Sequence, residues 1–297
     1  MADYNRFIVI GDRIRVTKGI EDVQITDKHF LKKANKQQVH MIKKDLFSTG
    51  NENFYLMNFE SVGNTISPYY EDWNYWIVEL EHNERSSNIK LALLLSTINL
   101  FSLFEKLGKN GMSNHTNGFH NFIADHTVRD NVKEISQADG IEIQEIYRLL
   151  QNFDKERDRY TYINKALSDY RNLQDIPRDS PFYILAMFAI LEALLVHKSQ
   201  SVPIGHQLRS KLSLLNNRFE HPIDFFEIFG NVSFKKVIDT LYKYRSDVAH
   251  GDFSDFNGEL QLLVDSDNVS KIIHRILKAT LKQAIKEPQL IEDLKNC

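Results

Sequence analysis

The feature that most constrains the fold of this 297-residue chain is a change of sequence pattern near Tyr160. Before this point short β-type segments alternate with helical ones, whereas after it apolar residues recur at helical spacing between loops that contain Pro177, Pro203, Pro222 and Gly230. The five helical segments predicted after the change are 162–173, 181–197, 206–215, 234–249 and 269–286. Long helices joined by short loops are typical of an antiparallel bundle. We therefore predict an α+β chain: a mixed α/β domain at 1–150, of unknown role, for which a sensor or regulatory domain is one candidate, followed by a helical bundle at 151–297.

The N-terminal half carries both kinds of pattern. Alternation around Gly11-Asp12 predicts two strands within 7–16, arranged as a hairpin, and further strands are predicted at 54–59 and 75–80. Helices are predicted from a cap at Thr26-Asp27 to about residue 48, at 89–107, at 119–135, and at 141–159 after a break at Gly140.

Five aromatic residues lie close together in the N-terminal half: Tyr69, Tyr70, Trp73, Tyr75 and Trp76. Such a cluster forms either a stacking platform for nucleic-acid bases or the packing of a core and sheet edge. We favour packing, because this density of aromatic side chains is usual in mixed α/β domains.

Three histidines, His115, His120 and His126, surround a loop rich in glycine and asparagine. Two histidine ligands on one helical face need a spacing of four residues, which this group does not provide. We predict no metal site here and no cofactor elsewhere.

Composition narrows the class of protein further. A hydrophobic content of 42% is enough for a packed core, and a formal net charge of −3 excludes a globally basic nucleic-acid binder. The single cysteine, Cys297, leaves no intramolecular disulfide and no thiolate cluster. With no segment read as a signal peptide or a membrane span, we expect a cytoplasmic protein that does not bind membranes.

The segment 234–251 holds the residues best suited to chemistry. At 100° per residue, Arg245 falls in the middle of an apolar stripe formed with Ile238, Leu241 and Val248. An unpaired charge there is costly, and Arg stays protonated in proteins, so it needs a partner. Glu192 is the one charged residue of the apolar segment 182–196, and we predict that it pairs with Arg245.

His250 follows Arg245 with four residues between them, and Gly251 follows directly as a natural helix stop. A histidine in the final turn either interacts with the helix dipole or remains available for proton transfer. The stop at Gly251 lets its ring point along the helix end, which favours the second interpretation once Arg245 is taken into account.

Three segments together resemble the HEPN superfamily, in particular its Apea-like branch. They are Leu191-Glu192-Ala193-Leu194-Leu195, the segment from His206 to Leu212, and the segment from Tyr242 to Gly251. The hallmark of the family is an Arg and a His separated by four to six residues, with a polar residue directly after the Arg; Arg245, Ser246 and His250 match it. The resemblance covers about residues 160–297.

This resemblance implies a metal-independent endoribonuclease that acts as a homodimer. Its expected role is that of a bacterial toxin or anti-phage defence effector with an antitoxin or phage trigger. Arg245 and His250 would be catalytic, and Ser246, Asp247 and Glu192 would support them. The segment 204–245 carries seven Lys and Arg against four acidic residues, which suits an RNA substrate, and we expect Lys243, Arg209 and Tyr242 to contact it. Two alternatives stay open: a non-catalytic HEPN module that binds RNA or nucleotide or serves as an interaction scaffold, and a purely structural helical domain.

Overall fold

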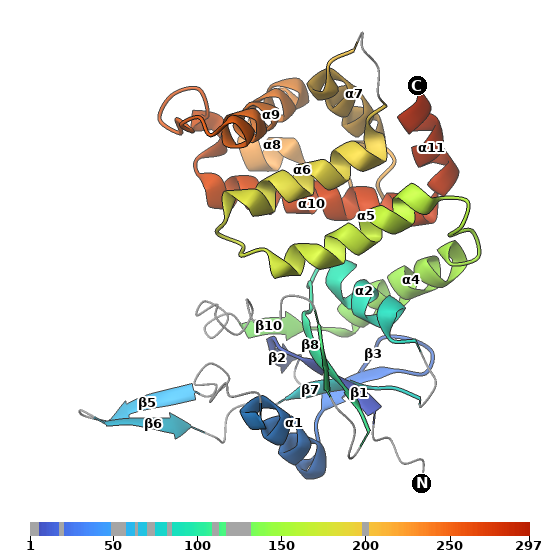
Figure 1. Cartoon of the computed structure of the whole chain (residues 1–297), viewed down its shortest axis with the longest axis vertical. Coiled ribbons are helices and arrows are strands. Elements are labelled where there is room, and N and C mark those ends of the chain that lie inside the picture. The colour runs from blue at the N-terminus through green and yellow to red at the C-terminus, as the bar shows by residue number, and fades with distance from the viewer. Residues whose placement is uncertain are drawn as a thin grey trace. The chain divides into compact units, whose positions relative to one another are not determined.

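The structure is a computed structural model, and it describes residues 6–17, 21–48, 58–62, 65–69, 75–81, 85–108, 113–116, 132–197 and 202–297. The chain divides into two compact units, Met1–Gln151 and Asn152–Cys297. The first unit contains strands and helices, and the second is helical in its described residues (Figure 1). The fold is therefore mixed α and β, in agreement with the predicted class.

The first unit is built on a six-stranded antiparallel sheet with the order β3-β4-β7-β1-β8-β9. Its strands are β1 (Arg6–Ile10), β3 (Val23–Gln24), β4 (Phe30–Lys33), β7 (Trp76–Glu79), β8 (Ser102–Leu107) and β9 (Ser113–His115). The central position of β1 follows from its sequence, because Phe7 to Ile10 are all buried and only a strand covered on both faces tolerates such a run.

Two smaller pairings complete the strands of this unit. They are the parallel pair β2 (Arg13–Val16) with β10 (Val132–Ile135), and the antiparallel pair β5 (Asn58–Val62) with β6 (Thr65–Tyr69). Strands are therefore present on both sides of Gly11-Asp12, as predicted, but the predicted hairpin is wrong. β1 pairs with β7 and β8, whereas β2 leaves the sheet to pair with β10.

Helix α1 (Lys36–Ser48) covers one face of the six-stranded sheet (Figure 1). Met41 and Ile42 of α1 pack into a cluster with Phe7 and Val9 of β1 and with other residues of the same face. The prediction placed the start of this helix at Thr26-Asp27, which is wrong because 30–33 form β4. The helix begins after Asn35, where the side chains of Asn35 and Gln38 each accept a hydrogen bond from the other's backbone N–H, at 3.0 and 2.9 Å.

The apolar segment 89–107 is divided between a helix and a strand, so the single helix predicted there is wrong. Helix α2 (Ser87–Leu95) ends before Asn99, which adopts a left-handed backbone with φ 54°, and β8 follows. A buried helix and a strand covered on both faces give the same unbroken apolar run, so periodicity cannot separate them.

Helix α4 (Gln137–Phe153) begins earlier than predicted and includes Gly140, so the predicted break at Gly140 is wrong. A Cβ at Gly140 would lie 2.5 Å from the Gln24 carbonyl oxygen, so this glycine permits close packing of α4 against β3. Of the helix predicted at 119–135, residues 132–135 form β10, and the rest lies outside the described residues.

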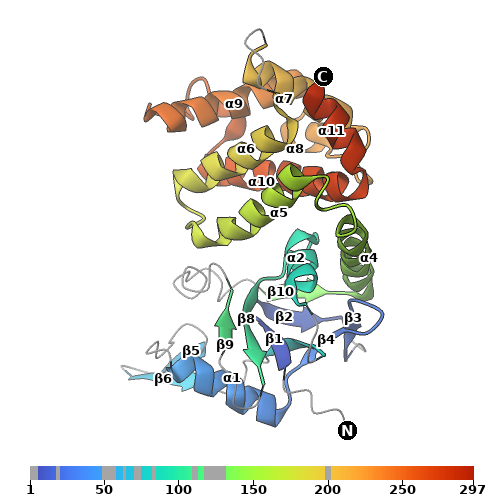
Figure 2. The same ribbon diagram turned by 45° about the vertical axis from the view of Figure 1, so that its right-hand side comes forward.

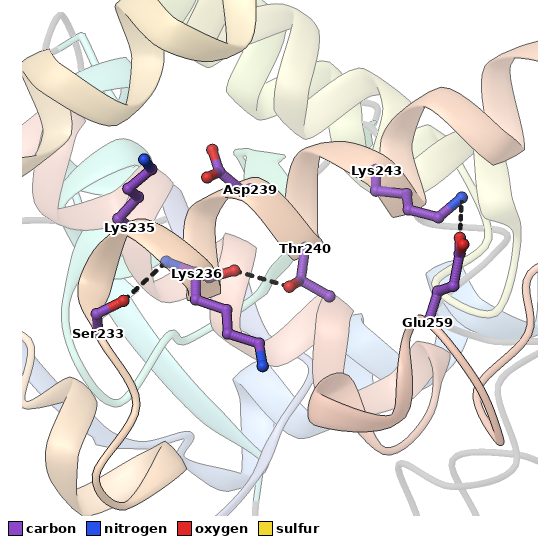
Figure 3. Close-up of a pocket in the computed structure, with 7 residues that line it drawn as sticks. All are labelled: Ser233, Lys235, Lys236, Asp239, Thr240, Lys243 and Glu259. Atoms are coloured by element: carbon purple, nitrogen blue, oxygen red, sulfur yellow. Dashed lines mark hydrogen bonds and ion pairs between the residues drawn. The ribbon is translucent and has the colours of Figure 1, made fainter.

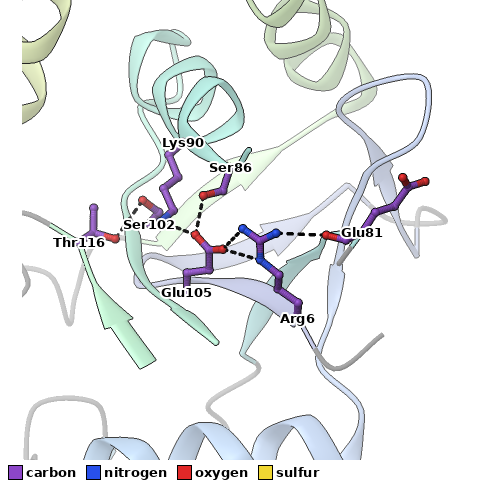
Figure 4. A network of polar contacts seen from close by, with 7 residues as sticks. All are labelled: Arg6, Glu81, Ser86, Lys90, Ser102, Glu105 and Thr116. Atoms are coloured by element: carbon purple, nitrogen blue, oxygen red, sulfur yellow. Dashed lines mark hydrogen bonds and ion pairs between the residues drawn. The ribbon is translucent and has the colours of Figure 1, made fainter. Parts of the chain in front are cut away.

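A buried carboxylate joins three elements of this unit (Figure 4). Glu105 of β8 is 2% exposed; its Oε1 accepts a hydrogen bond from Arg6 Nε at 2.8 Å, and Lys90 Nζ lies 2.8 Å from its Oε2. Ser86 Oγ donates to Oε2 at 2.5 Å. Burial by itself raises the pKa of Glu105, but the bonds from Lys90, Ser86 and Arg6 outweigh it and lower that pKa.

The second unit consists of packed helices (Figure 2). They are α5 (Thr161–Asn172), η2 (Leu173–Asp175), α6 (Pro181–Leu195), α7 (Ile204–Asn216), α8 (Phe225–Phe229), α9 (Phe234–His250), η3 (Gln261–Leu263), α10 (Ser266–Lys286) and α11 (Pro288–Asn296). The five predicted helical segments match α5, α6, α7, α9 and α10, whereas the short helices α8 and α11 were not predicted.

Helix α6 lies at the centre of this unit and contacts α5, α7, α9, α10 and α11. Figures 1 and 2 both show α5, α6 and α10 side by side. Its sequence explains this place: Pro181 occupies the first turn, Ser180 caps it by accepting from Phe182 N–H at 3.3 Å, and the helix that follows is apolar apart from Glu192. A helix that is apolar on all sides is stable only when neighbours cover it.

Among the described residues, no helix combines the length and apolar character needed to span a bilayer.

Candidate functional site

Helices α6 and α9 bring Glu192 and Arg245 together, as predicted. Arg245 Nη2 donates to Glu192 Oε2 at 3.2 Å. Arg245 Nε lies 3.1 Å from Glu192 Oε1 without forming a hydrogen bond, and both of these atoms are shielded from solvent. The contact therefore combines one hydrogen bond with a close ion pair and restricts the orientation of the guanidinium.

Arg245 is also contacted by Tyr242, which lies one turn earlier on the same helix. The guanidinium carbon of Arg245 is 5.6 Å from the centre of the Tyr242 ring, a cation–π contact. Phe188 of α6 meets the same ring edge to face, with centroids 6.4 Å apart. Burial raises the pKa of the Tyr242 hydroxyl; Arg245 lowers it and Glu192 raises it further.

Gly205 of α7 fixes how closely this tyrosine packs. A Cβ at Gly205 would lie 2.9 Å from Tyr242 Cδ1, too close for any side chain without movement of the ring. The sequence analysis placed Tyr242 among residues that contact substrate. In the structure it is partly buried between α6 and α7 and supports Arg245.

The buried face of α9 differs from the predicted stripe. Its buried residues are Val237, Ile238, Leu241, Tyr244 and Asp247, whereas Val248 is half-buried and Ala249 is exposed. The prediction that Arg245 lies in the middle of the apolar stripe is wrong. Its side chain is 27% exposed and lies at the edge of that stripe, because the last turn of α9 is not enclosed by neighbouring helices.

The end of α9 has the predicted glycine stop. Gly251 adopts the left-handed conformation with φ 75° and ψ 20°. Gly251 N–H donates to Val248 O at 3.3 Å and Asp252 N–H donates to Asp247 O at 2.8 Å, the pair of bonds that closes a helix in a Schellman motif. His250, in the last turn, is exposed and forms no side-chain hydrogen bond or ion pair within the described part of the chain.

The predicted supporting and substrate-contacting residues have varied surroundings. Asp247 is buried and accepts hydrogen bonds from Lys243 Nζ at 3.1 and 3.3 Å. Lys243 Nζ also lies 2.8 Å from Glu259. Bonds to Glu259 and then Asp247 raise the pKa of Lys243. Asp247 therefore orients a basic group, and Ser246 is half-buried beside it.

Arg209 of α7 is engaged by the carboxylate of Asp239 on α9, with Nη1 donating to Oδ1 at 2.6 Å. This pair borders an open depression of about 310 Å³ lined by the residues drawn in Figure 3, namely Ser233, Lys235, Lys236, Asp239, Thr240, Lys243 and Glu259. Lys235 and Lys236 were not predicted as functional. Both belong to the basic residues counted in 204–245, and Lys236 carries a further signal in its position, since Lys236, Lys243 and His250 recur at intervals of seven along α9.

Helix geometry limits what Arg245 and His250 of one chain can do together. Five residues along an α-helix turn a side chain by about 140° and advance it by about 7.5 Å. Arg245 points toward α6, whereas His250 lies on the face of α9 that carries Lys236 and Lys243. A single chain therefore presents a positioned cation and an unengaged imidazole to different sides of one helix.

Of the three histidines considered for metal binding, the structure describes His115. His115 of β9 packs edge to face on Phe104 at 6.2 Å, and His120 and His126 lie outside the described residues. No group of three His, Cys, Asp or Glu residues with the geometry for a metal ion occurs in the described ranges. Of the aromatic cluster, Tyr75 and Trp76 are buried, so these two pack in the core and are not available for stacking.

No protein-family model, curated protein or solved structure matches this chain.

Proposed function

We propose that the second unit is a HEPN-like helical domain and that the protein is a metal-independent endoribonuclease acting as a homodimer. The observation that carries the proposal is the pairing of a positioned guanidinium with an unengaged imidazole near the end of one helix. Glu192 and Tyr242 hold Arg245, and the stop at Gly251 leaves His250 exposed.

The proposed reaction needs only these groups and the RNA itself. His250 takes the proton of a ribose 2′-OH, the 2′-oxygen attacks the adjacent phosphorus, and the bond from phosphorus to the 5′-oxygen breaks. The departing 5′-oxygen receives a proton from an imidazolium, and a 2′,3′-cyclic phosphate remains. Arg245 stabilises the negative charge that develops on the phosphorane oxygens.

A homodimer supplies what one chain lacks. Arg245 and His250 of one chain diverge by about 140°. A phosphate that contacts both an arginine and a histidine would therefore receive these two residues from different copies of the chain. Two copies also provide one histidine as the base and a second as the acid. The proposed role for such an enzyme is that of a bacterial toxin or anti-phage effector.

A second candidate function is an RNA-binding module that does not cleave. The same divergence favours it, because a chain that stays monomeric would bind a phosphate through one face of α9 without bringing Arg245 to it. In this case the Glu192–Arg245 pair would serve the stability of the α6–α9 contact alone.

Cleavage of RNA in the presence of EDTA tests the proposal. We expect the wild-type protein to cleave, and both Arg245→Ala and His250→Ala to lose at least about a hundredfold in rate, the usual size of a general-acid–base or electrostatic contribution. Circular dichroism and light scattering establish that fold and oligomeric state are kept. Equal rates in wild type and both variants would refute the proposal, and binding without cleavage would favour the second candidate.

A further inference from the structure

Beyond the Arg245 site, one face of α9 has the properties of a binding surface for a nucleic-acid backbone. It contains Lys236, Lys243 and His250, spaced two turns apart; we call these three residues the lysine face. On an α-helix, residues seven apart differ by only about 20° in direction and lie about 10 Å apart along the axis. All three are exposed.

The charges around this face are unequally compensated. Asp239 is held by Arg209 at 2.6 Å, and both Asp247 and Glu259 are held by Lys243. Asp239 is thus engaged by a cation outside the face, whereas Asp247 and Glu259 engage Lys243, which belongs to the face. In contrast, the ammonium groups of Lys235 and Lys236 make no hydrogen bond or ion pair within the described residues, and Figure 3 shows the two pointing to opposite sides of the helix.

The lining of the depression indicates which part of a nucleic acid it suits. Lysine, serine, threonine and carboxylate side chains line it, and no aromatic residue is among them. Base recognition in single strands depends on aromatic stacking, whereas phosphate contacts need cations and hydroxyl groups. The depression therefore suits a phosphodiester backbone and gives no means to select a base sequence.

We propose that the backbone of a single-stranded RNA binds along the lysine face, from the depression at Lys236 past Lys243 to His250. This inference rests on the proposed function, because His250 at the end of the face is where the 2′-OH would be activated. The Glu259 side chain is 73% exposed, and its carboxylate forms an ion pair with Lys243. This ion pair engages an ammonium group that a phosphate would otherwise contact. Binding of RNA displaces Glu259 from Lys243.

Binding can be measured without cleavage by using a fluorescent 2′-O-methyl oligoribonucleotide, which lacks the 2′-OH nucleophile. For the full-length variant Lys236→Gln/Lys243→Gln we expect affinity to fall roughly ten- to thirtyfold near 0.1 M salt. The slope of log affinity against log salt should become shallower by about 1.4, because each lost phosphate contact on a single strand accounts for about 0.7. Lys236→Gln alone, which disturbs no ion pair, should make the slope shallower by about half of this amount.

The matched control is Lys271→Gln/Arg275→Gln, which removes the same charge from two exposed residues of α10 outside the depression. Its affinity and salt slope should stay at wild-type values. Glu259→Gln should act in the opposite direction and raise affinity roughly two- to fivefold, as expected for release of an exposed ion pair.

The outcomes separate this inference from the proposed function. Loss of binding in the lysine-face variants, with control binding intact and no RNA cleavage by wild type, supports RNA binding along the lysine face and refutes the proposed nuclease activity. Cleavage by wild type with equal binding by the lysine-face and control variants refutes RNA binding along the lysine face and supports the proposed nuclease activity. Absence of binding by the wild-type protein overturns the inference.

Discussion

Arg245 and Glu192 face each other across the contact between α9 and α6, with Nη2 3.2 Å from Oε2 and Nε 3.1 Å from Oε1. Their side chains are 27% and 17% exposed, so each charge is largely withdrawn from water. This relationship is the link between the packing of the bundle and the chemistry proposed for it, because the same contact that satisfies Glu192 also orients Arg245.

We expect Glu192→Leu to destabilise the protein by about 1–3 kcal/mol, less than for a fully buried pair because both side chains retain some exposure. Arg245→Leu should cost a similar amount, since it leaves Glu192 without its partner. The double variant should recover most of the loss, because no charge is then left unpaired. Urea unfolding followed by the circular dichroism of the helices measures this cycle. Additive losses in the double variant would contradict the pairing.

Gly205→Ala tests the packing behind Arg245. Helix propensity alone predicts a gain of up to about 1 kcal/mol from this substitution. We expect a net loss of about 1–2 kcal/mol instead, because the new Cβ would lie 2.9 Å from the Tyr242 ring, which Phe188 prevents from yielding freely. In a Tyr242→Ala background, where the ring is absent, the same substitution should become stabilising. Thermal unfolding of the four proteins checks the change of sign.

The stop at Gly251 gives a simpler prediction. Because its φ is 75°, Gly251→Ala should cost about 1 kcal/mol, and Gly251→Asn should cost less, since Asn tolerates the left-handed region better than Ala. Ala249→Gly, on the exposed side of the same turn, is a control for general loosening of the helix end. A stability order in which Asn is worse than Ala would show that the turn adopts another conformation.

Glu105 makes the stability of the first unit depend on pH. Its folded-state pKa is lowered, so the folded protein binds fewer protons than the unfolded chain at acidic pH. The stabilisation is complete above the unfolded-state pKa of about 4.3 and is lost as pH falls through that value toward the folded-state pKa. Glu105→Gln should therefore cost roughly 2–4 kcal/mol at neutral pH, and the difference from wild type should shrink in acid.

The two tryptophans, Trp73 and Trp76, both belong to the first unit, so their fluorescence follows its unfolding selectively. Wild type and Glu105→Gln can be compared by urea unfolding at pH 7 and at a series of pH values below the unfolded-state pKa of about 4.3. A difference between the two proteins that stays constant across this range would mean that the carboxylate does not supply the stabilisation.

The sequence was most informative where one charge interrupts an apolar helix. Glu192 is such a residue in α6, and the need to pair a buried charge predicted its contact with Arg245 across 53 positions of sequence. The same reasoning misplaced Arg245 on its own helix, because periodicity does not show that packing ends before Val248 and Ala249. The stop at Gly251 was predictable from its residue type alone.

The first unit was less predictable, for two physical reasons. The segment from Leu100 to Lys106 is buried throughout and runs into strand β8 (Ser102–Leu107), and such a run has no alternation to mark the strand. The partner of β2 is β10, more than a hundred residues later, and no local pattern specifies that pairing. Of the lysine face, Lys243 and His250 were predicted to contact or act on RNA, whereas Lys236 was not, although its spacing of seven residues from Lys243 is visible in the sequence.

The chemistry of the RNA ends tests the central claim most directly. Mass spectrometry of RNA incubated with the full-length protein in EDTA should find a 2′,3′-cyclic phosphate on one side of each cut and a 5′-hydroxyl on the other. Both should be absent with His250→Ala. Fragments with 5′-phosphate ends, or 2′,3′-cyclic phosphate ends that persist at wild-type rate in His250→Ala, would contradict a site in which His250 activates the ribose 2′-OH.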